Sequence, residues 1–348
     1  MSASKDHWGS HSRTAWLDAS RARRCPVCES DSWCQIGAGT HDGVVLCKRV
    51  PSPREKTNRD GARYWVHHVE RRVESVAHVT ETQLSVECAN ADVRHAAYSA
   101  VLAALRLDER HRANLVARGL GAEEIRANGY RSLAIEGRSS LVRAIGRSVG
   151  ASVMAGVPGV ARVERDGRSW WTLKGAAGMM IPSRDLAGRI VALKVRADEA
   201  NAQLRYSAVS SRRAGGPSAA VNVHVPKGAR ERCAATGVLW ITEGELKADV
   251  CTALSELAVI GVPGVSLWAS ALSIVKELNP RVVVVAFDAD WQDPDPKKQP
   301  VRDARERLTH ALEVAGHRVR AAEWPLATAK GLDDLLLVQR SQRARSAA

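Results

Sequence analysis

Carboxylates in the last third of the chain have the residue types and the order of a metal-dependent site. Glu243 and Asp288 each follow a β-branched apolar run, Asp290 lies two positions further on, and Asp333 and Asp334 come near the end. Mg²⁺ prefers oxygen ligands, keeps several waters and usually binds one or two protein carboxylates together with substrate phosphates. We therefore expect Asp288 and Asp290 to ligate magnesium or manganese, with Glu243 holding a second ion or acting as a base. Asp333 and Asp334 are additional candidates.

The segments around these acids alternate between strand and helix patterns. We predict strands at 238–242, 258–262, 281–287 and 318–323. Apolar residues at helical spacing predict helices near 246–257, 267–277 and 301–315. A parallel sheet would bring Glu243 and Asp288 to neighbouring carboxyl ends of strands, where such sheets bind ligands. A single acid at a strand end is often only a helix N-cap. The prediction of a metal site therefore rests on the occurrence, in this order, of Glu243, the Asp288/Asp290 pair and the Asp333/Asp334 pair.

Cysteines near the N-terminus have metal-ligand spacing. Seven cysteines include Cys25 and Cys28, separated by two residues, with Cys34 and Cys47 close behind. In a reducing compartment this spacing is typical of metal binding more than of disulfides. A segment so poor in core-forming residues needs a cross-link, such as a bound metal ion, to fold. We therefore predict a small module in which four thiolates hold a structural Zn²⁺. His41 lies in the same loop and could replace Cys34, so the fourth ligand stays open between these two.

The middle of the chain mixes helical and strand patterns. Helical spacing occurs at 92–107, 112–118 and 122–128, whereas strand-like runs occur at 171–173, 178–182 and 189–196. Alternation along the last run puts Lys194 and Arg196 on one face of a sheet. That face is either a binding surface for phosphates or a solvated face without a role.

The length and net charge of the chain limit the number of domains and the kind of partner that we expect. A chain of 348 residues commonly forms two or three domains, and a formal charge of +13 with a pI near 9.8 favours a polyanionic partner such as nucleic acid. Much of this charge is arginine in an alanine-rich chain, however, which genome base composition also produces. No apolar run approaches the roughly 20 residues of a membrane span and no signal-peptide core is present, so we expect a cytoplasmic protein without a membrane partner.

Three motifs together carry a family resemblance. The sequences ITEGELKAD (241–249), GVPGV (261–265) and FDAD (287–290) resemble the TOPRIM domain of bacterial-type primases and type IA topoisomerases. The stretches 181–191 and 204–211 resemble the basic subdomain that precedes this domain in primases. With the zinc module in front, the order of parts is most similar to TOPRIM primase-like proteins of phages, plasmids and integrated mobile elements.

The resemblance implies an α/β fold and assigns roles to residues. Its parts would be a zinc ribbon (1–50), a linker with short strands (51–90), a mixed α+β basic primase-like subdomain (91–235) and a TOPRIM parallel sheet flanked by helices (236–340). Glu243, Asp288 and Asp290 match the family's acidic metal-binding and catalytic positions. Residues matched to its nucleotide- and template-binding groove are Arg184, Lys194, Arg196, Arg205, Tyr206 and Lys247. The chain departs from the replicative primases at 245–247, where those enzymes have Tyr or a similar residue, which leaves template preference open.

The activity implied is that of a primase. Such an enzyme is a magnesium-dependent nucleotidyltransferase that makes short primers from NTPs on single-stranded DNA by two-metal-type transfer. The chain contains no G-x4-G-K-[ST] loop, so a replicative helicase would be a separate partner. Two other classes share the TOPRIM domain: an adaptor that binds single strands or replication proteins without catalysis, and a nuclease. A topoisomerase would need a tyrosine nucleophile, and none of the 4 tyrosines lies in a recognisable gate domain.

Overall fold

The chain forms two compact units, which we call the N-terminal unit (Met1–Glu81) and the C-terminal unit (Thr82–Ala348). The computed structural model describes residues 16–21, 23–37, 43–57, 62–69, 86–165, 167–199, 205–219, 221–295 and 298–346. Within these ranges, no helix has both the length and the apolar character needed to cross a bilayer. His41 lies outside the described residues, so its part in the zinc site stays a prediction.

The N-terminal unit is a five-stranded antiparallel sheet in the order β1-β2-β3-β5-β4. Its strands are β1 (Trp16–Asp18), β2 (Gln35–Gly37), β3 (Val44–Cys47), β4 (Glu55–Thr57) and β5 (Arg63–His68). The core is small and contains Ala19 and Val45 beside three buried cysteines. Within 51–90, where we expected a linker with short strands, β4 and β5 pair with each other and belong to this sheet.

The first part of the C-terminal unit packs helices on an antiparallel sheet. The sheet has the order β11-β10-β9-β6, and a separate hairpin joins β7 to β8. The strands are β6 (Arg131–Leu133), β7 (Val160–Arg165), β8 (Arg168–Leu173), β9 (Gly178–Arg184), β10 (Ile190–Ala197) and β11 (Tyr206–Ala208). The helices are α1 (Ala91–Ala104), α2 (Glu109–Ala117), α3 (Ala122–Asn128), α4 (Arg138–Val149) and α5 (Ala151–Met154). The apolar spacing of α1 and α4 buries Tyr98, Val101 and Ile145 against Leu193 of β10.

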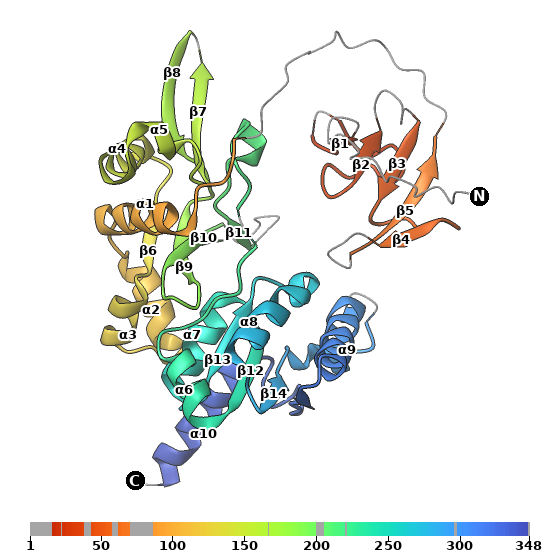
Figure 1. The fold of residues 1–348 in the computed structure, drawn as a ribbon, viewed down its shortest axis with the longest axis vertical. Coiled ribbons are helices and arrows are strands. Elements are labelled where there is room, and N and C mark those ends of the chain that lie inside the picture. Colours follow the sequence, from red (N-terminus) through yellow and green to blue (C-terminus); the bar gives the residue numbers. More distant parts are fainter. Residues whose placement is uncertain are drawn as a thin grey trace, which may run out of the picture. The chain divides into compact units, whose positions relative to one another are not determined.

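The second part is a parallel sheet in the order β13-β12-β14-β15. Its strands β13, β12 and β14 are labelled in Figure 1. Its strands are β12 (Val238–Glu243), β13 (Val259–Val262), β14 (Val282–Val285) and β15 (Arg318–Ala321). The α-helices around it are α6 (Ala229–Thr236), α7 (Glu245–Leu254), α8 (Ala271–Leu278), α9 (Gln299–Val314) and α10 (Leu332–Ser346). Two short 3-10 helices, η4 (Val265–Ser270) and η5 (Ala289–Gln292), follow β13 and β14. The predicted α/β class is confirmed here, with a parallel sheet flanked by helices.

Helices cover both faces of the parallel sheet, which explains its continuous apolar strands. Residues of α6, α8 and α9 pack with Leu239 and Ile241 of β12 on one face. On the other face, α7 and α10 pack with Val259 and Trp324. A strand buried on both faces has no polar side to alternate with, and β14 is therefore four consecutive valines.

The two parts of the C-terminal unit share an apolar contact and a buried polar network. Leu246 of α7 packs with Tyr130 and Met179 of the first part. The Tyr130 hydroxyl donates to Asp249 Oδ2 at 2.5 Å, and His224 Nε2 lies 2.9 Å from Asp249 Oδ1. Because the other nitrogen of His224 accepts the backbone N–H of Arg184, Nε2 carries the proton toward Asp249. These contacts fix the position of the parallel sheet against the antiparallel one.

Candidate functional site

Glu243 lies at the carboxyl end of β12, followed by a turn that requires glycine. Gly244 has φ +85° and ψ 143°, and its N–H donates to Val262 O at 2.8 Å. This conformation turns the chain directly from the strand into α7. The Glu243 side chain is thereby left at the sheet edge that such folds use for ligands.

Asp288 and Asp290 follow the neighbouring strand, β14, and both are buried, with 3% and 7% of their surface exposed. The backbone N–H of Ala289 donates to Lys330 O at 2.7 Å, which fixes the 330–333 segment beside the site. A Cβ at Gly331 would come within 3.1 Å of Asp288 Oδ1 and closer still to Asp333 Oδ1. Glycine at this position therefore lets the two carboxylates approach each other.

Four carboxylates thus meet at one edge of the parallel sheet, and we call them the carboxylate cluster: Glu243, Asp288, Asp290 and Asp333. Three of the four are the acids expected as catalytic. Asp334, the remaining candidate, is exposed and accepts the N–H of Gly331 at 3.2 Å, as a helix-capping carboxylate does.

Lysines contact the carboxylate cluster from several directions. Lys247 Nζ pairs closely with Asp288 Oδ1 and lies 3.5 Å from Glu243 Oε1. Lys298 Nζ lies 2.6 Å from Asp290 Oδ2. Lys330 Nζ lies 3.4 Å from Asp288 Oδ2 and 3.5 Å from Asp290 Oδ2. The lysines therefore balance part of the negative charge that burial concentrates here.

Arg118 reaches the same cluster from α2, with an Nη 3.3 Å from Asp333 Oδ2. Our reading of the sequence missed Arg118, Lys298 and Lys330. For Lys330 the one local signal in the sequence was its position, with Gly331, shortly before Asp333 and Asp334. Arg118 is distant in sequence and had none.

Two carboxylate oxygens of the cluster have no partner in the part of the chain that the structure describes. Among the described residues, Asp290 Oδ1 and Asp333 Oδ1 are buried and accept no hydrogen bond. A buried acceptor left unsatisfied costs free energy, roughly 1–3 kcal/mol and more for a charged group. Hard oxygens in this state fit a divalent cation such as Mg²⁺, which accepts one or two carboxylates and completes its shell with water and phosphate.

Electrostatics in the cluster agree with a need for positive charge. Burial raises the pKa of Glu243 to about 7; Lys247 opposes this rise, while Asp288 and Asp290 add to it. Burial also raises the pKa of Asp333. For Lys247 burial acts downward, but attraction to Glu243 and Asp288 outweighs it and raises the pKa. Glu243 and Asp333 therefore resist ionisation, which a bound cation would relieve.

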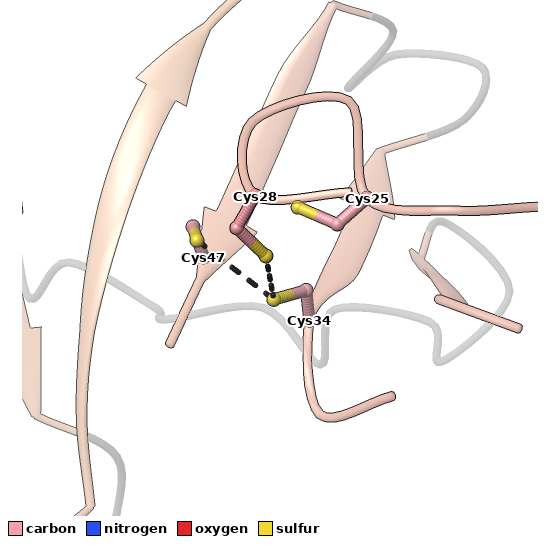
Figure 2. A group of neighbouring side chains, drawn as sticks. All are labelled: Cys25, Cys28, Cys34 and Cys47. Atoms are coloured by element: carbon pink, nitrogen blue, oxygen red, sulfur yellow. Dashed lines mark hydrogen bonds between the residues drawn. The ribbon is translucent and has the colours of Figure 1, made fainter. Parts of the chain in front are cut away.

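The N-terminal unit holds the second site, the thiol cluster of Cys25, Cys28, Cys34 and Cys47. Their four sulfur atoms all lie within 4.8 Å of one another. Cys34 Sγ lies 3.6 Å from Cys28 Sγ and 3.8 Å from Cys47 Sγ, and Figure 2 shows the side chains converging. This arrangement suits tetrahedral Zn²⁺ in a closed structural shell.

Backbone groups after β3 stabilise the thiolate form of this cluster. The N–H groups of Arg49 and Val50 donate to Cys47 Sγ at 3.4 and 3.3 Å, and that of Lys48 donates to Cys34 Sγ at 3.5 Å. For Cys28, burial opposes ionisation, but hydrogen bonds from the Ser30 backbone and the other thiols lower the pKa to about 7. For Cys25 and Cys34, burial outweighs the hydrogen bonds and raises the pKa. Zinc binds thiolates, so donors arranged in this way favour its uptake.

The basic residues expected in a binding groove have different surroundings. Lys194 Nζ lies 2.6 Å from Glu245 Oε2, with both side chains largely buried. Arg196 donates to Asn114 Oδ1 at 3.1 Å. Arg184 is 5% exposed and donates to a backbone carbonyl at 2.9 Å.

Arg205 and Tyr206, at the edge strand β11, are exposed. Of the groove residues we expected, these two present the most side-chain surface to solvent. Lys247 belongs to the carboxylate cluster instead. The groove assignment as a whole stays a prediction.

One family model matches part of this chain. A model described as "Domain of unknown function (DUF3854)" matches residues 234–343, which cover the parallel sheet and α10. No curated protein matches the chain.

Solved structures similar to this one are bacterial primases. A structure of the Aquifex aeolicus primase with zinc-binding and RNA polymerase domains superimposes with a TM-score of 0.54 at 15% identity, covering 74% of this chain and 61% of that one. A DNA primase domain from Pseudomonas aeruginosa gives 0.55 at 18% identity, covering 72% and 77%. The RNA polymerase domain of Mycobacterium tuberculosis primase DnaG, in complex with double-stranded DNA, gives 0.55 at 17% identity, covering 73% and 80%. The fold of this chain is therefore similar to that of bacterial DnaG primase catalytic cores, and it carries a four-cysteine cluster near the N-terminus.

Proposed function

We propose that this protein is a primase-like nucleotidyltransferase that depends on Mg²⁺ or Mn²⁺, and that its parallel sheet is a TOPRIM domain. The observation that carries the proposal is the carboxylate cluster, in which Asp290 Oδ1 and Asp333 Oδ1 lie buried without a partner among the described residues. The cluster stands at the carboxyl ends of parallel strands in a fold similar to primase catalytic cores. The organisation into a zinc module, a basic subdomain and a TOPRIM domain belongs to the same proposal.

The reaction is transfer of a nucleotide to a 3′-hydroxyl. The hydroxyl oxygen forms a bond to the α-phosphorus of an NTP, the α–β bridging bond breaks, pyrophosphate leaves and the hydroxyl proton passes to solvent. Asp288, Asp290 and Asp333 would hold the divalent ion, which supplies charge to stabilise the attacking and leaving oxygens. Lys298 and Lys330 have side chains 31% and 58% exposed, so they can turn from the carboxylates to the triphosphate.

Single-stranded DNA and NTPs are the proposed substrates. Arg205 would pair with a phosphate of the template, and the neighbouring Tyr206 offers an exposed ring on which a base can stack. The zinc module would help to select the template, and a separate replicative helicase would supply unwound DNA. The setting we propose is a phage, plasmid or integrated mobile element, following the resemblance in the order of zinc module, basic subdomain and TOPRIM domain.

A direct assay tests the proposal. Purified protein is incubated with single-stranded DNA, labelled NTPs and Mg²⁺ or Mn²⁺, and the products are separated by length. Short oligomers that depend on template and metal, and that Asp288→Asn abolishes, are the expected result. Degraded template would identify a nuclease instead. Binding of single strands without synthesis on any template would identify an adaptor.

A further inference from the structure

We infer that Lys247 is a built-in cation of the carboxylate cluster, occupying the position of a second divalent ion, so that the site holds one Mg²⁺ rather than two. The inference rests on the magnesium site of the proposed function and names how that site is charged. It gives Lys247 a positioning role in place of the nucleotide-binding role that the motif suggested.

The contacts of Lys247 are those of a bridging cation. Its Nζ pairs closely with Asp288 Oδ1 and lies 3.5 Å from Glu243 Oε1, so it stands between the ends of β12 and β14. In two-metal sites the ions lie roughly 3.5–4 Å apart and make contact with the same group of carboxylates. An ion bridging Glu243 and Asp288 would need the space that the ammonium already fills.

Lys247 is also the least exposed of the lysines that contact the cluster. Its side chain is 23% exposed, against 31% for Lys298 and 58% for Lys330. It lies in the first turn of α7, whose start is fixed by the Gly244 turn, and a Cβ added at Gly331 would lie 3.5 Å from its Cε. Lys298 and Lys330 can exchange carboxylates for phosphates, whereas Lys247 is held among the acids.

The oxygens left for a metal are those with which this ammonium does not pair. Glu243 and Asp288 Oδ1 face Lys247, while Asp290 Oδ1 and Asp333 Oδ1 have no partner among the residues described. These two oxygens, with Asp288 Oδ2 once Lys330 turns away, include the one or two carboxylate ligands that a single Mg²⁺ takes. A second divalent ion would meet the fixed positive charge of Lys247 at close range.

Counting bound metal tests this inference without using enzyme activity. Mn²⁺ is titrated into the zinc-loaded full chain, and bound ions are counted by electron paramagnetic resonance or equilibrium dialysis. Asp288→Asn identifies which ions belong to the cluster. We expect one such ion in the parent and two in Lys247→Met, with Mn²⁺ affinity increased about tenfold or more because a unit charge is removed at close range. The matched control Lys298→Met removes a cluster lysine that is more exposed, and it should leave the count at one.

Each outcome bears on the inference. Two cluster ions in the parent would overturn it, whether or not any variant folds, and so would a count of one in a folded Lys247→Met protein. Lys247→Arg keeps the charge and should keep the count at one; two ions in that variant would also overturn the inference. One ion in the parent, two in Lys247→Met and no primer synthesis would support the built-in cation while the proposed function fails, so the two failures are distinguishable.

Discussion

The thiol cluster and the carboxylate cluster are both groups of four metal-ligand side chains, but their charges are balanced in different ways. Around the thiols, backbone N–H groups of Lys48, Arg49 and Val50 donate to sulfur, and these groups cannot leave without unfolding the loop. Around the carboxylates, lysine side chains supply the charge, and two of them are 31% and 58% exposed. Backbone donors suit a permanent ion, whereas mobile lysines suit a ligand that enters and leaves.

The packing around the two sites also indicates a permanent ion at the thiol cluster and an exchangeable ligand at the carboxylate cluster. The thiol cluster is most of the small core of its unit, so the metal and the fold depend on each other. The carboxylate cluster stands at the edge of a sheet that already has extensive apolar packing on both faces. Loss of metal should therefore unfold the first region and leave the second folded.

The largest expected effect is loss of the zinc module. Cys47→Ser removes one ligand of the four, and structural zinc contributes on the order of 10 kcal/mol or more to folding such modules. We expect zinc content to fall and amides of the N-terminal unit to exchange rapidly, while the C-terminal unit keeps its protection. Metal analysis and hydrogen exchange measure both. Cys88→Ser, an exposed cysteine outside the cluster, is the control. A zinc-free Cys47→Ser protein with the parent's exchange pattern would contradict the prediction.

The second-largest expected effect is the loss of stability when the largely buried ion pair between Lys194 and Glu245 is broken. Glu245 is a carboxylate beside the cluster whose cation is largely buried and cannot turn away. The side chains of Lys194 and Glu245 are 13% and 4% exposed. Lys194→Met would leave the Glu245 carboxylate buried without a cation. Breaking a buried pair in this way lowers the free energy of unfolding by about 3–5 kcal/mol. Denaturant unfolding should show this loss, and Lys194→Met with Glu245→Gln should recover most of it. Equal stability of the single and double variants would mean that the pair does not determine this part of the fold.

The third effect separates catalysis from folding. Asp288→Asn removes a carboxylate from a crowded acidic site, so we expect primer synthesis to fall by a hundredfold or more, since metal charge is worth several kcal/mol in the transition state. Folding and zinc content should stay at the parent's level. The exposed acid Glu277 of α8 provides the control Glu277→Gln, which should synthesise normally. Normal synthesis by a folded Asp288→Asn protein would remove this residue from the site.

A smaller effect concerns the turn that places Glu243. Gly244 and Gly264 both have open space where a Cβ would lie, but Gly244 has φ +85° whereas Gly264, at φ 164°, is extended. Gly244→Ala should therefore cost about 1–2 kcal/mol through backbone strain alone, and it should reduce synthesis by moving Glu243. Gly264→Ala should be close to neutral in denaturant unfolding. Equal stabilities of the two variants would show that the turn is not strained.

Local patterns in the sequence predicted the strands that carry the acids. The run 238–242 became β12 (Val238–Glu243), because β-branched and aromatic residues between turn signals favour a strand. The run 318–323 became β15 (Arg318–Ala321). Our reading assigned no helix to α10 (Leu332–Ser346). Its apolar residues are consecutive rather than spaced by turns, and packing against α7 decides its structure.

The parts of the site that depend on long-range contact could not be predicted. The acids at the strand ends follow from the parallel sheet, and the close thiols follow from cysteine spacing. Arg118, however, meets Asp333 across 215 positions of sequence. The partner of Lys194 was equally hidden, because alternation predicts the face of a strand but not what packs on it.

The smallest expected effect is on DNA binding. It tests whether the exposed Arg205 contacts a phosphate, in contrast to the largely buried basic residues Arg184 and Lys194, which contact other protein groups. Arg205 is exposed, so its replacement by alanine should leave stability unchanged. If its guanidinium pairs with one phosphate, Arg205→Ala should weaken single-strand binding a few-fold and reduce the slope of log affinity against log salt by about 1. Fluorescence anisotropy over a salt series measures both quantities. Arg213→Ala, an exposed arginine outside the proposed groove, is the matched control. An equal change in slope for both variants would mean that Arg205 contributes only to the general positive field, whereas a change confined to Arg205→Ala would place the template at β11.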